Sequence, residues 1–215
     1  MKQFDEELTS LKGRVIEMGR LSQEMITLAV DALVKHDGKA IKEVRASEKV
    51  TDRLQVEIDD DAIRLIAVYT PVAHDLRFLL MAGRISLELE RIGDQARNMC
   101  KYVKLFFSQP NQQTPEELPQ MAHDVCRMLH DSIEAFDQED AERAIEIMKT
   151  DKVVDDLDHK LFNGVATELA ETSDLTRTVA LVLLSRSLER IGDLVTNICE
   201  EIVYLVDAKD IRHTI

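Results

Sequence analysis

Eight acidic residues occur in pairs spaced four positions apart, a spacing that places both carboxylates of a pair on the same face of a helix. In the first half of the chain these residues form what we call the first quartet: Glu48, Asp52, Glu90 and Asp94. In the second half they form the second quartet: Asp151, Asp155, Glu189 and Asp193. Neighbouring carboxylates repel one another, and oxygen ligands suit hard cations such as Mg²⁺, Ca²⁺, Mn²⁺ or iron. The residue types therefore indicate metal binding.

The position of the pairs is more informative than their spacing, because 41 acidic residues in 215 would produce about eight such pairs by chance. Glu48 and Asp94 are equally far from Pro71, and so are Asp52 and Glu90. The second quartet is centred in the same way on position 172. Residues equidistant from the turn of an antiparallel helical hairpin lie at the same height. Each hairpin is thus predicted to gather four carboxylates that bind a multivalent cation. Because a carboxylate can bridge two ions, a site with more than one ion is an open alternative.

Two further residue types recur beside each quartet. Asn98 and Asn197 follow the last Asp by four positions, so they extend the same face and are expected to ligate an ion or orient its ligands. Gly93 and Gly192 lie in the middle of predicted helices, where glycine costs about 1 kcal/mol relative to alanine. Their duplication predicts that a partner helix or a bound ion approaches closely at these points.

Other reactive side chains have ordinary interpretations. His159 follows Asp155 by four residues but is expected to be a surface histidine. Cys100 and Cys199 are expected to be buried packing thiols. Two arginines that follow a quartet glutamate are expected to form structural ion pairs: Arg91 and Arg190. Five methionines at helical positions are expected in the core: Met18, Met25, Met81, Met99 and Met128.

Helical periodicity and helix breakers predict an all-α protein of six long helices. The expected ranges are 4–36, 38–69, 71–107, 117–138, 141–171 and 174–207. Thr70 and Pro71 resemble an N-cap and first helical residue, and Asp37-Gly38 resembles a turn. Short connections between long helices favour up-and-down antiparallel packing.

The two halves of the chain repeat each other. LERIGDQARNMC (89–100) and LERIGDLVTNIC (188–199) match at eight of twelve positions with an offset of 99. Upstream, DGKAIKEVRASEKVTDRL aligns with DAERAIEIMKTDKVVDDL at an offset of 103. We expect two tandem pseudo-symmetric three-helix bundles, 1–108 and 116–215, joined by a Pro/Gln/Asn-rich linker at 109–115.

Composition excludes several classes of function. A formal charge of −14 with 4% aromatic residues disfavours nucleic-acid binding. Three cysteines, no secretory signal and no apolar run of membrane-spanning length favour a cytoplasmic protein without direct membrane insertion. Nucleotide-binding and hydrolase motifs are absent, so no catalytic residue and no cofactor-binding residue is predicted.

The duplicated ERIGD segments, each followed by Asn and Cys, together with the acidic pairs on the preceding helices, resemble the PhoU family over essentially the whole chain. ASEKVTD, DLRFLLM and RHTI are smaller likenesses. The resemblance implies a pair of three-helix bundles with metal sites formed by the two quartets. The expected ions are iron, zinc, manganese or magnesium, in one or several copies. Asp151 is shorter than the equivalent Glu48, which would alter ion number or affinity.

The resemblance also implies a non-enzymatic negative regulator of phosphate uptake and of the phosphate-starvation response. Such a protein acts as an adaptor between the ATPase subunit of a phosphate ABC transporter and a membrane sensor histidine kinase, and a homodimer is expected. Two alternatives stay open from the residues alone. One is a carboxylate-bridged dimetal enzyme of the ferritin-like class, although no Glu-x-x-His pair occurs. The other is a purely structural helical scaffold.

Overall fold

The computed structural model describes residues 2–35, 38–108, 113–172 and 174–212. They form six helices: α1 (Lys2–Lys35), α2 (Gly38–Tyr69), α3 (Ala73–Phe106), α4 (Glu117–Gln138), α5 (Ala141–Thr172) and α6 (Leu175–Asp207). No strand occurs in the described part of the chain. The predicted all-α class with six long helices is confirmed.

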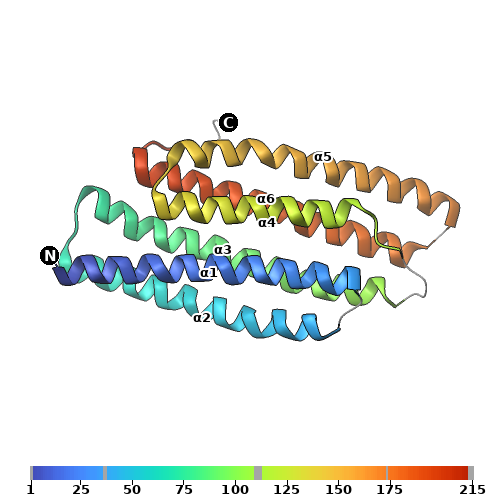
Figure 1. The fold of residues 1–215 in the computed structure, drawn as a ribbon, viewed down its shortest axis with the longest axis horizontal. Helices are drawn as coiled ribbons and strands as arrows, with labels where there is room; N and C mark the ends of the chain where they lie inside the picture. The colour runs from blue at the N-terminus through green and yellow to red at the C-terminus, as the bar shows by residue number, and fades with distance from the viewer. Residues whose placement is uncertain (1, 36–37, 109–112, 173, 213–215) are drawn as a thin grey trace.

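Each helix buries an apolar stripe with helical spacing. In α1 the buried residues include Leu11, Val15, Met18 and Met25, which recur at three- to four-residue steps or their multiples. Five of the six helices have 32 to 34 residues, which corresponds to about 50 Å at 1.5 Å per residue. All six run along the long axis of the molecule (Figure 1).

The helices form two bundles, one from each half of the chain. Helices α1, α2 and α3 pack against one another, as do α4, α5 and α6, and the halves meet through α3 with α6 and α1 with α4 (Figure 1). Phe78 of α3 stacks on Phe136 of α4 with ring centroids 5.9 Å apart. Arg84 of α3 forms an ion pair with Glu201 of α6 at 3.1 Å. Apolar and charged contacts therefore join the two halves.

The predicted start of the third helix at Thr70 and Pro71 is wrong. The Thr70 N–H donates to the Ile66 carbonyl at 3.0 Å, and Thr70 has a left-handed φ of 46°. Thr70 therefore closes the last turn of α2, and Pro71 lies in the connection. Helix α3 begins at Ala73 after the N-cap residue Val72, whose side chain makes no capping bond.

The start of α6 shows a side-chain cap. The Asp174 carboxylate accepts a hydrogen bond from the Arg177 backbone N–H at 3.0 Å, which satisfies one of the free donors of the first turn. Two other sequence features fall partly outside the described residues. Asp37 of the expected turn lies outside the described residues, whereas Gly38 is the first residue of α2. Positions 109–112 of the expected linker also lie outside the described residues.

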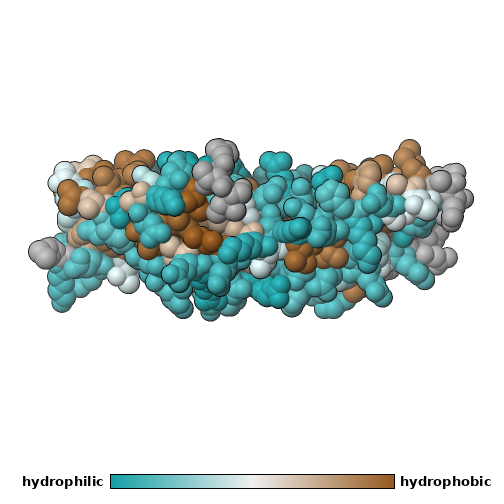
Figure 2. Space-filling view, turned by 90° about the horizontal axis from the view of Figure 1, so that it is seen from above, coloured by the Kyte–Doolittle hydropathy of each residue, from teal (hydrophilic) through white to brown (hydrophobic). Residues whose placement is uncertain are grey.

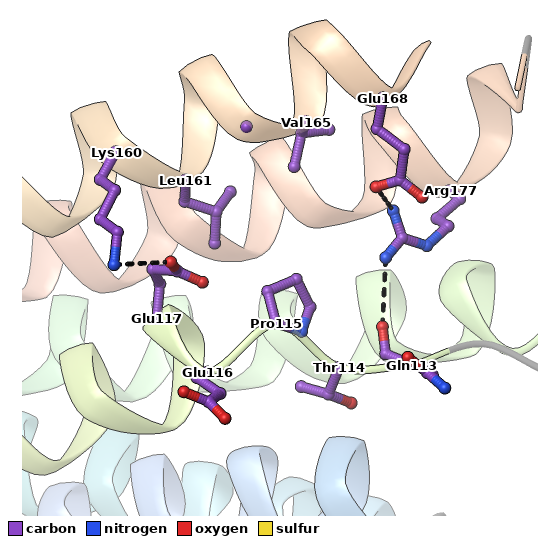
Figure 3. Close-up of a pocket in the computed structure, with 11 residues that line it drawn as sticks. Gln113, Thr114, Pro115, Glu116, Glu117, Lys160, Leu161, Val165, Glu168 and Arg177 are labelled. Atoms are coloured by element: carbon purple, nitrogen blue, oxygen red, sulfur yellow. Dashed lines mark hydrogen bonds and ion pairs between the residues drawn. The ribbon is translucent and has the colours of Figure 1, made fainter. Parts of the chain in front are cut away.

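The described end of the linker is held against the second bundle by charged contacts (Figure 3). Arg177 forms an ion pair with Glu168 and donates to the Gln113 carbonyl at 3.2 Å. Lys160 and Glu117 form a second ion pair at 3.1 Å. These residues line a cavity of about 440 Å³ that contains no member of either quartet. The linker is thus bound to Arg177 of α6, which in turn pairs with Glu168 of α5, and the second ion pair joins α4 to α5.

The molecular surface is mostly hydrophilic on the face drawn in Figure 2, with separate apolar patches. Exposed apolar side chains on α5 include Val153 and Phe162, each 48% exposed. Isolated apolar residues of this kind are normal on a helical bundle. None of the described helices combines the length and the apolarity that crossing a bilayer demands.

Candidate metal centres

Helices α2 and α3 bring the members of the first quartet together. Arg97 on α3 contacts Glu48 Oε1 on α2 at 3.2 Å and donates to Asp94 Oδ1 at 2.7 Å. Glu48 and Asp94 therefore lie at the same level of the hairpin, as their equal distance from the turn predicts. The Arg97 Nε–H is buried and has no acceptor among the described residues, so the two ion pairs leave part of the guanidinium unsatisfied.

Glu90 shows the electrostatic cost of this arrangement. Burial raises the pKa of the Glu90 carboxyl, and the charges of Asp94 and Asp52 raise it further. Arg91 and Arg97 oppose this effect. Glu90 thus interacts with carboxylates on its own helix and on α2, and the first quartet is only partly neutralised by arginine.

The second quartet lies on α5 and α6, and more of its carboxyl groups have raised pKa values. Burial raises the pKa of Asp151 to about 7, with further contributions from the charges of Asp155, Asp193 and Glu189. The pKa values of Glu189 and Asp193 are also raised, mainly by burial and then by neighbouring acids. Thr196 stands where the first repeat has Arg97, and its hydroxyl donates to the Asp193 carbonyl at 2.7 Å. No arginine therefore replaces Arg97 in the second quartet.

The predicted close approach is confirmed at Gly192 but not at Gly93, where a Cβ would fit at ordinary contact distance. A Cβ on Gly192 would clash with Asp151 Oδ1, so the absence of a side chain lets this carboxylate rest on α6. A Cβ on Gly93 would lie 3.4 Å from Met25 Cε and from Thr51 Oγ1. The close neighbour is thus a quartet member in the second repeat and packing side chains in the first.

The supporting residues expected from the sequence have varied surroundings. Asn98 accepts a hydrogen bond from Lys101 at 2.8 Å, and Asn197 is half-buried. His159 is exposed, with its Nδ1 2.9 Å from the Asp155 carbonyl rather than the carboxylate. Its expected role as a surface residue is therefore confirmed, and the structure supports it as no more than a neighbour of Asp155.

The two cysteines and five methionines expected to be buried are buried. Burial raises the pKa of the Cys100 thiol to about 11 and also raises that of Cys199, so neither thiol is activated as a nucleophile. Arg91 forms its ion pair with Glu88 at 2.8 Å, whereas Arg190 is exposed and acts on Asp193 only through its charge. All five methionines lie in the core: Met18, Met25, Met81, Met99 and Met128.

Sequence reasoning missed two groups beside the quartets. Arg97 could have been found, because it follows Asp94 by three positions and has no basic equivalent in the other repeat. Asp158 is buried on α5, accepts a hydrogen bond from Ser185 at 2.7 Å and forms an ion pair with Arg186 at 3.1 Å. Arg186 also approaches Glu189 at 3.5 Å, so it links Asp158 to the edge of the second quartet.

A separate acidic cluster on α4 is already neutralised. Within the described ranges, three ligand atoms from His, Cys, Asp or Glu lie within 4.8 Å of one another only at His130, Asp131 and Glu134. Arg143 contacts Asp131 at 2.9 Å and Glu134 at 2.6 Å, so it takes the place a metal ion would need. In neither quartet, all of whose members the structure describes, do three carboxylate oxygens from different residues lie within 4.8 Å of one another, and their donors are all oxygens. Their chemistry fits a hard multivalent cation.

The fold and the duplicated acidic hairpins define a class of helical proteins built from two similar three-helix units, and comparison with known proteins identifies it. The PhoU domain profile matches residues 15–103 and again 118–202. The chain belongs to the PhoU family.

Similar proteins extend over almost the whole chain. The phosphate-specific transport system accessory protein PhoU of Escherichia coli K12 is 35% identical over 98% of this chain and 88% of its own length. A homologue in Clostridium acetobutylicum is 31% identical over 98% and 97%. Among solved structures, the phosphate transport system regulatory protein PhoU of Streptococcus pneumoniae has a TM-score of 0.90 at 28% identity, covering 96% of this chain and 98% of that one. PhoU of Pseudomonas aeruginosa has the same TM-score and identity, with coverage of 96% and 100%.

Proposed function

We propose that this protein is an accessory regulator of phosphate transport. The observation that carries the proposal is the match to proteins of that name along 98% of the chain, together with the PhoU domain in both repeats. The relatives are named accessory or regulatory proteins, which favours a regulator over the dimetal enzyme that the acidic pairs alone left open.

In this proposal the protein is a non-enzymatic, cytoplasmic adaptor. It contacts the ATPase subunit of a phosphate ABC transporter and a membrane sensor histidine kinase, and it restrains both phosphate uptake and the starvation response when phosphate is plentiful. Two long bundles joined through α3 and α6 support such a role, because they present an extended, firmly packed surface. A homodimer belongs to the same proposal.

The two quartets are proposed to hold metal ions that strengthen the hairpins. Glu48, Asp52, Glu90 and Asp94 would supply the oxygens in the first repeat. In the second repeat they would come from Asp151, Asp155, Glu189 and Asp193. Burial and then mutual repulsion raise the pKa values of four of these acids, and a bound iron, zinc, manganese or magnesium ion would supply the positive charge that offsets both effects. In the first quartet, Arg97 must yield Glu48 and Asp94 to the ion.

The regulatory role is tested by deleting the gene in its own organism and following a phosphate-starvation promoter in phosphate-rich medium. We expect expression to rise in the deletion strain and to return to the basal level with the wild-type gene. Affinity capture from phosphate-rich and phosphate-starved cells should recover the transporter ATPase and the kinase. Unchanged promoter activity after deletion would contradict the regulator, and recovery of neither protein would contradict the adaptor.

The metal sites are tested with the double substitution Asp94→Ala and Asp193→Ala, which removes one ligand from each quartet. Metal content after equilibration with manganese or iron and desalting should fall to a small fraction of the wild-type value, while helix content measured by circular dichroism stays nearly constant. Asp60→Ala with Asp156→Ala is the matched control, because both residues are exposed acids on the same hairpins. Equal metal content in the two variants would show that the ligand assignment is wrong.

A further inference from the structure

A cleft between α2 and α3 gathers positive charge on a protein whose net charge is −14. Its volume is about 470 Å³. Besides Ala46 and Glu48, every residue that lines it is a cation: Lys42, Arg45, Lys49, Arg97 and Lys101. We call this the basic cleft. It adjoins the first quartet through Glu48 and Arg97 but otherwise uses different residues.

The helical spacing forces these cations together. Lys42, Arg45 and Lys49 lie at positions i, i+3 and i+7 of α2, so they share one face. Arg97 and Lys101 are four residues apart on α3, which packs against α2. Like charges at these separations destabilise a helix. The arrangement therefore has a cost unless an anion binds there.

Most of this positive charge has no carboxylate partner. Arg97 is paired with Glu48 and Asp94, and Lys101 donates to the Asn98 amide oxygen at 2.8 Å. In the part of the chain that the structure describes, no carboxylate oxygen lies within 4.0 Å of the Lys42, Arg45, Lys49 or Lys101 side chains. Elsewhere on the surface such pairs are frequent, as between Lys35 and Asp31 at 2.8 Å.

Comparison of the two repeats shows that the fold does not require this cluster. With the offsets of 103 for α2 and 99 for α3, the five cations correspond in the second repeat to Ile145, Met148, Lys152, Thr196 and Glu200. Only one positive charge is kept and one position becomes acidic. A three-helix unit of the same family is thus built without the cluster, and its presence in the first repeat calls for a function of its own.

We propose that the basic cleft binds a condensed phosphate anion, such as diphosphate or a short oligophosphate chain. Lysine ammonium groups and the arginine guanidinium are the side chains that suit phosphate oxygens. Orthophosphate carries about two charges at neutral pH, so it would balance only part of the four cations that have no carboxylate partner in the described part of the chain (Lys42, Arg45, Lys49 and Lys101), whereas a longer chain of phosphoryl groups balances them all. None of the described lining residues is aromatic, so the cleft offers no surface on which a nucleobase would stack.

The proposal depends neither on a metal ion nor on the regulatory role, and its test keeps them apart. The full-length chain is dialysed against a chelator and then into chelator-free buffer, and tripolyphosphate is titrated calorimetrically at about 0.1 M salt. The expected result is saturable binding of one anion per chain, roughly tenfold or more tighter than orthophosphate or sulfate.

A pair of triple variants locates the site. Lys42→Gln, Arg45→Gln and Lys101→Gln should weaken tripolyphosphate binding by roughly tenfold or more. The control Lys149→Gln, Lys152→Gln and Lys209→Gln removes the same charge from exposed positions of the second half and should change it less than about twofold. All six residues are exposed, so both variants should stay folded, and removing like charges from the cleft should leave the unfolding temperature of that variant unchanged or slightly raised.

Four outcomes would overturn the proposal. The first is the absence of saturable binding to the wild-type chain. The second is equal weakening by the two triple variants, which would indicate general electrostatic attraction. The third is equal affinity for sulfate or orthophosphate. The fourth is tighter binding of an oligoglutamate peptide than of tripolyphosphate, lost in the cleft variant, which would assign the cleft to an acidic protein segment.

Discussion

Asp151 has a pKa that reflects both the burial and the negative charge of the second quartet. Burial and three neighbouring carboxylates raise its pKa to about 7, and Gly192 leaves room for it against α6. The carboxyl is therefore poised between a protonated and an ionised form near neutral pH. A cation would favour the ionised form, so metal binding here should release protons.

The raised pKa of Asp151 predicts how the stability of the metal-free protein depends on pH. Between the pKa of an unfolded aspartate, about 3.9, and a value near 7, the folded state binds a proton that the unfolded state lacks. The contribution is therefore fully present below about pH 4 and is lost as the pH rises through 7. Asp151→Asn should flatten this decline and raise the free energy of unfolding at pH 8 by on the order of 1 kcal/mol.

Denaturant titrations from pH 5 to pH 8 measure this effect. The pKa values of Glu90, Glu189 and Asp193 are also raised, so the stability of the variant should still decline with rising pH, but less steeply than that of the wild type. Parallel stability curves for the wild type and Asp151→Asn would contradict the assigned cause.

Replacing Gly93 or Gly192 by alanine adds one Cβ atom and tests the contact made at each position. Gly93→Ala should be neutral or stabilising by up to about 1 kcal/mol, because the new Cβ meets Met25 and Thr51 at ordinary contact distance. Gly192→Ala displaces the Asp151 carboxylate, which can rotate away, so the loss should appear in metal affinity more than in stability. Calorimetric metal titration and thermal unfolding of both variants separate these effects. Unaltered metal affinity in Gly192→Ala would contradict the role given to Asp151.

The sequence predicts which residues of two paired helices lie at the same level more reliably than it predicts the contacts of individual side chains. Equal distances from the turn predicted that Glu48 and Asp94 lie at one level, and Arg97 contacts both. The start of α3 was predicted two residues too early, at Pro71 instead of Ala73. Thr70 closes α2 with its backbone N–H instead of capping α3 with its side chain. A periodic pattern fixes which face of a helix is buried, but it does not report where a long arginine side chain will reach.

The asymmetry between the hairpins leads to a prediction about Arg97. A cation entering the first quartet must displace this arginine from Glu48 and Asp94, whereas in the second quartet Arg186 contacts Glu189 alone, at 3.5 Å. Arg97→Met should therefore strengthen metal binding to the first quartet by several-fold and leave the second within about twofold. Titrations in an Asp193→Ala background isolate the first quartet. Weaker binding in Arg97→Met would contradict the competition.

The arrangement of the whole molecule was only partly predictable. The duplicated ERIGD segments and the helical periodicity predicted six helices in two similar units, and the observed fold agrees. How the units dock was not predictable, since it depends on individual contacts. Phe78 stacks on Phe136, and Arg77 donates to the Leu205 carbonyl at 3.1 Å. Contacts between such pairs do not produce a periodic pattern in the sequence.

Charge is distributed unevenly over the molecule. The excess of 41 acidic over 27 basic residues includes two quartets whose members repel one another, while cations collect in the basic cleft of the first repeat alone. The acidic quartets are thus present in both repeats, whereas the cluster of cations is present only in the first. The two repeats therefore share the three-helix scaffold and differ in the charged residues that they carry.

We propose that folding each hairpin assembles a metal site, and crystallography tests this proposal directly. Crystals grown with manganese or iron salts, measured at the absorption edge of the metal, should give an anomalous peak within each quartet, coordinated by its carboxylate oxygens. Quartets with their oxygens apart, water between them and no anomalous signal would contradict the account.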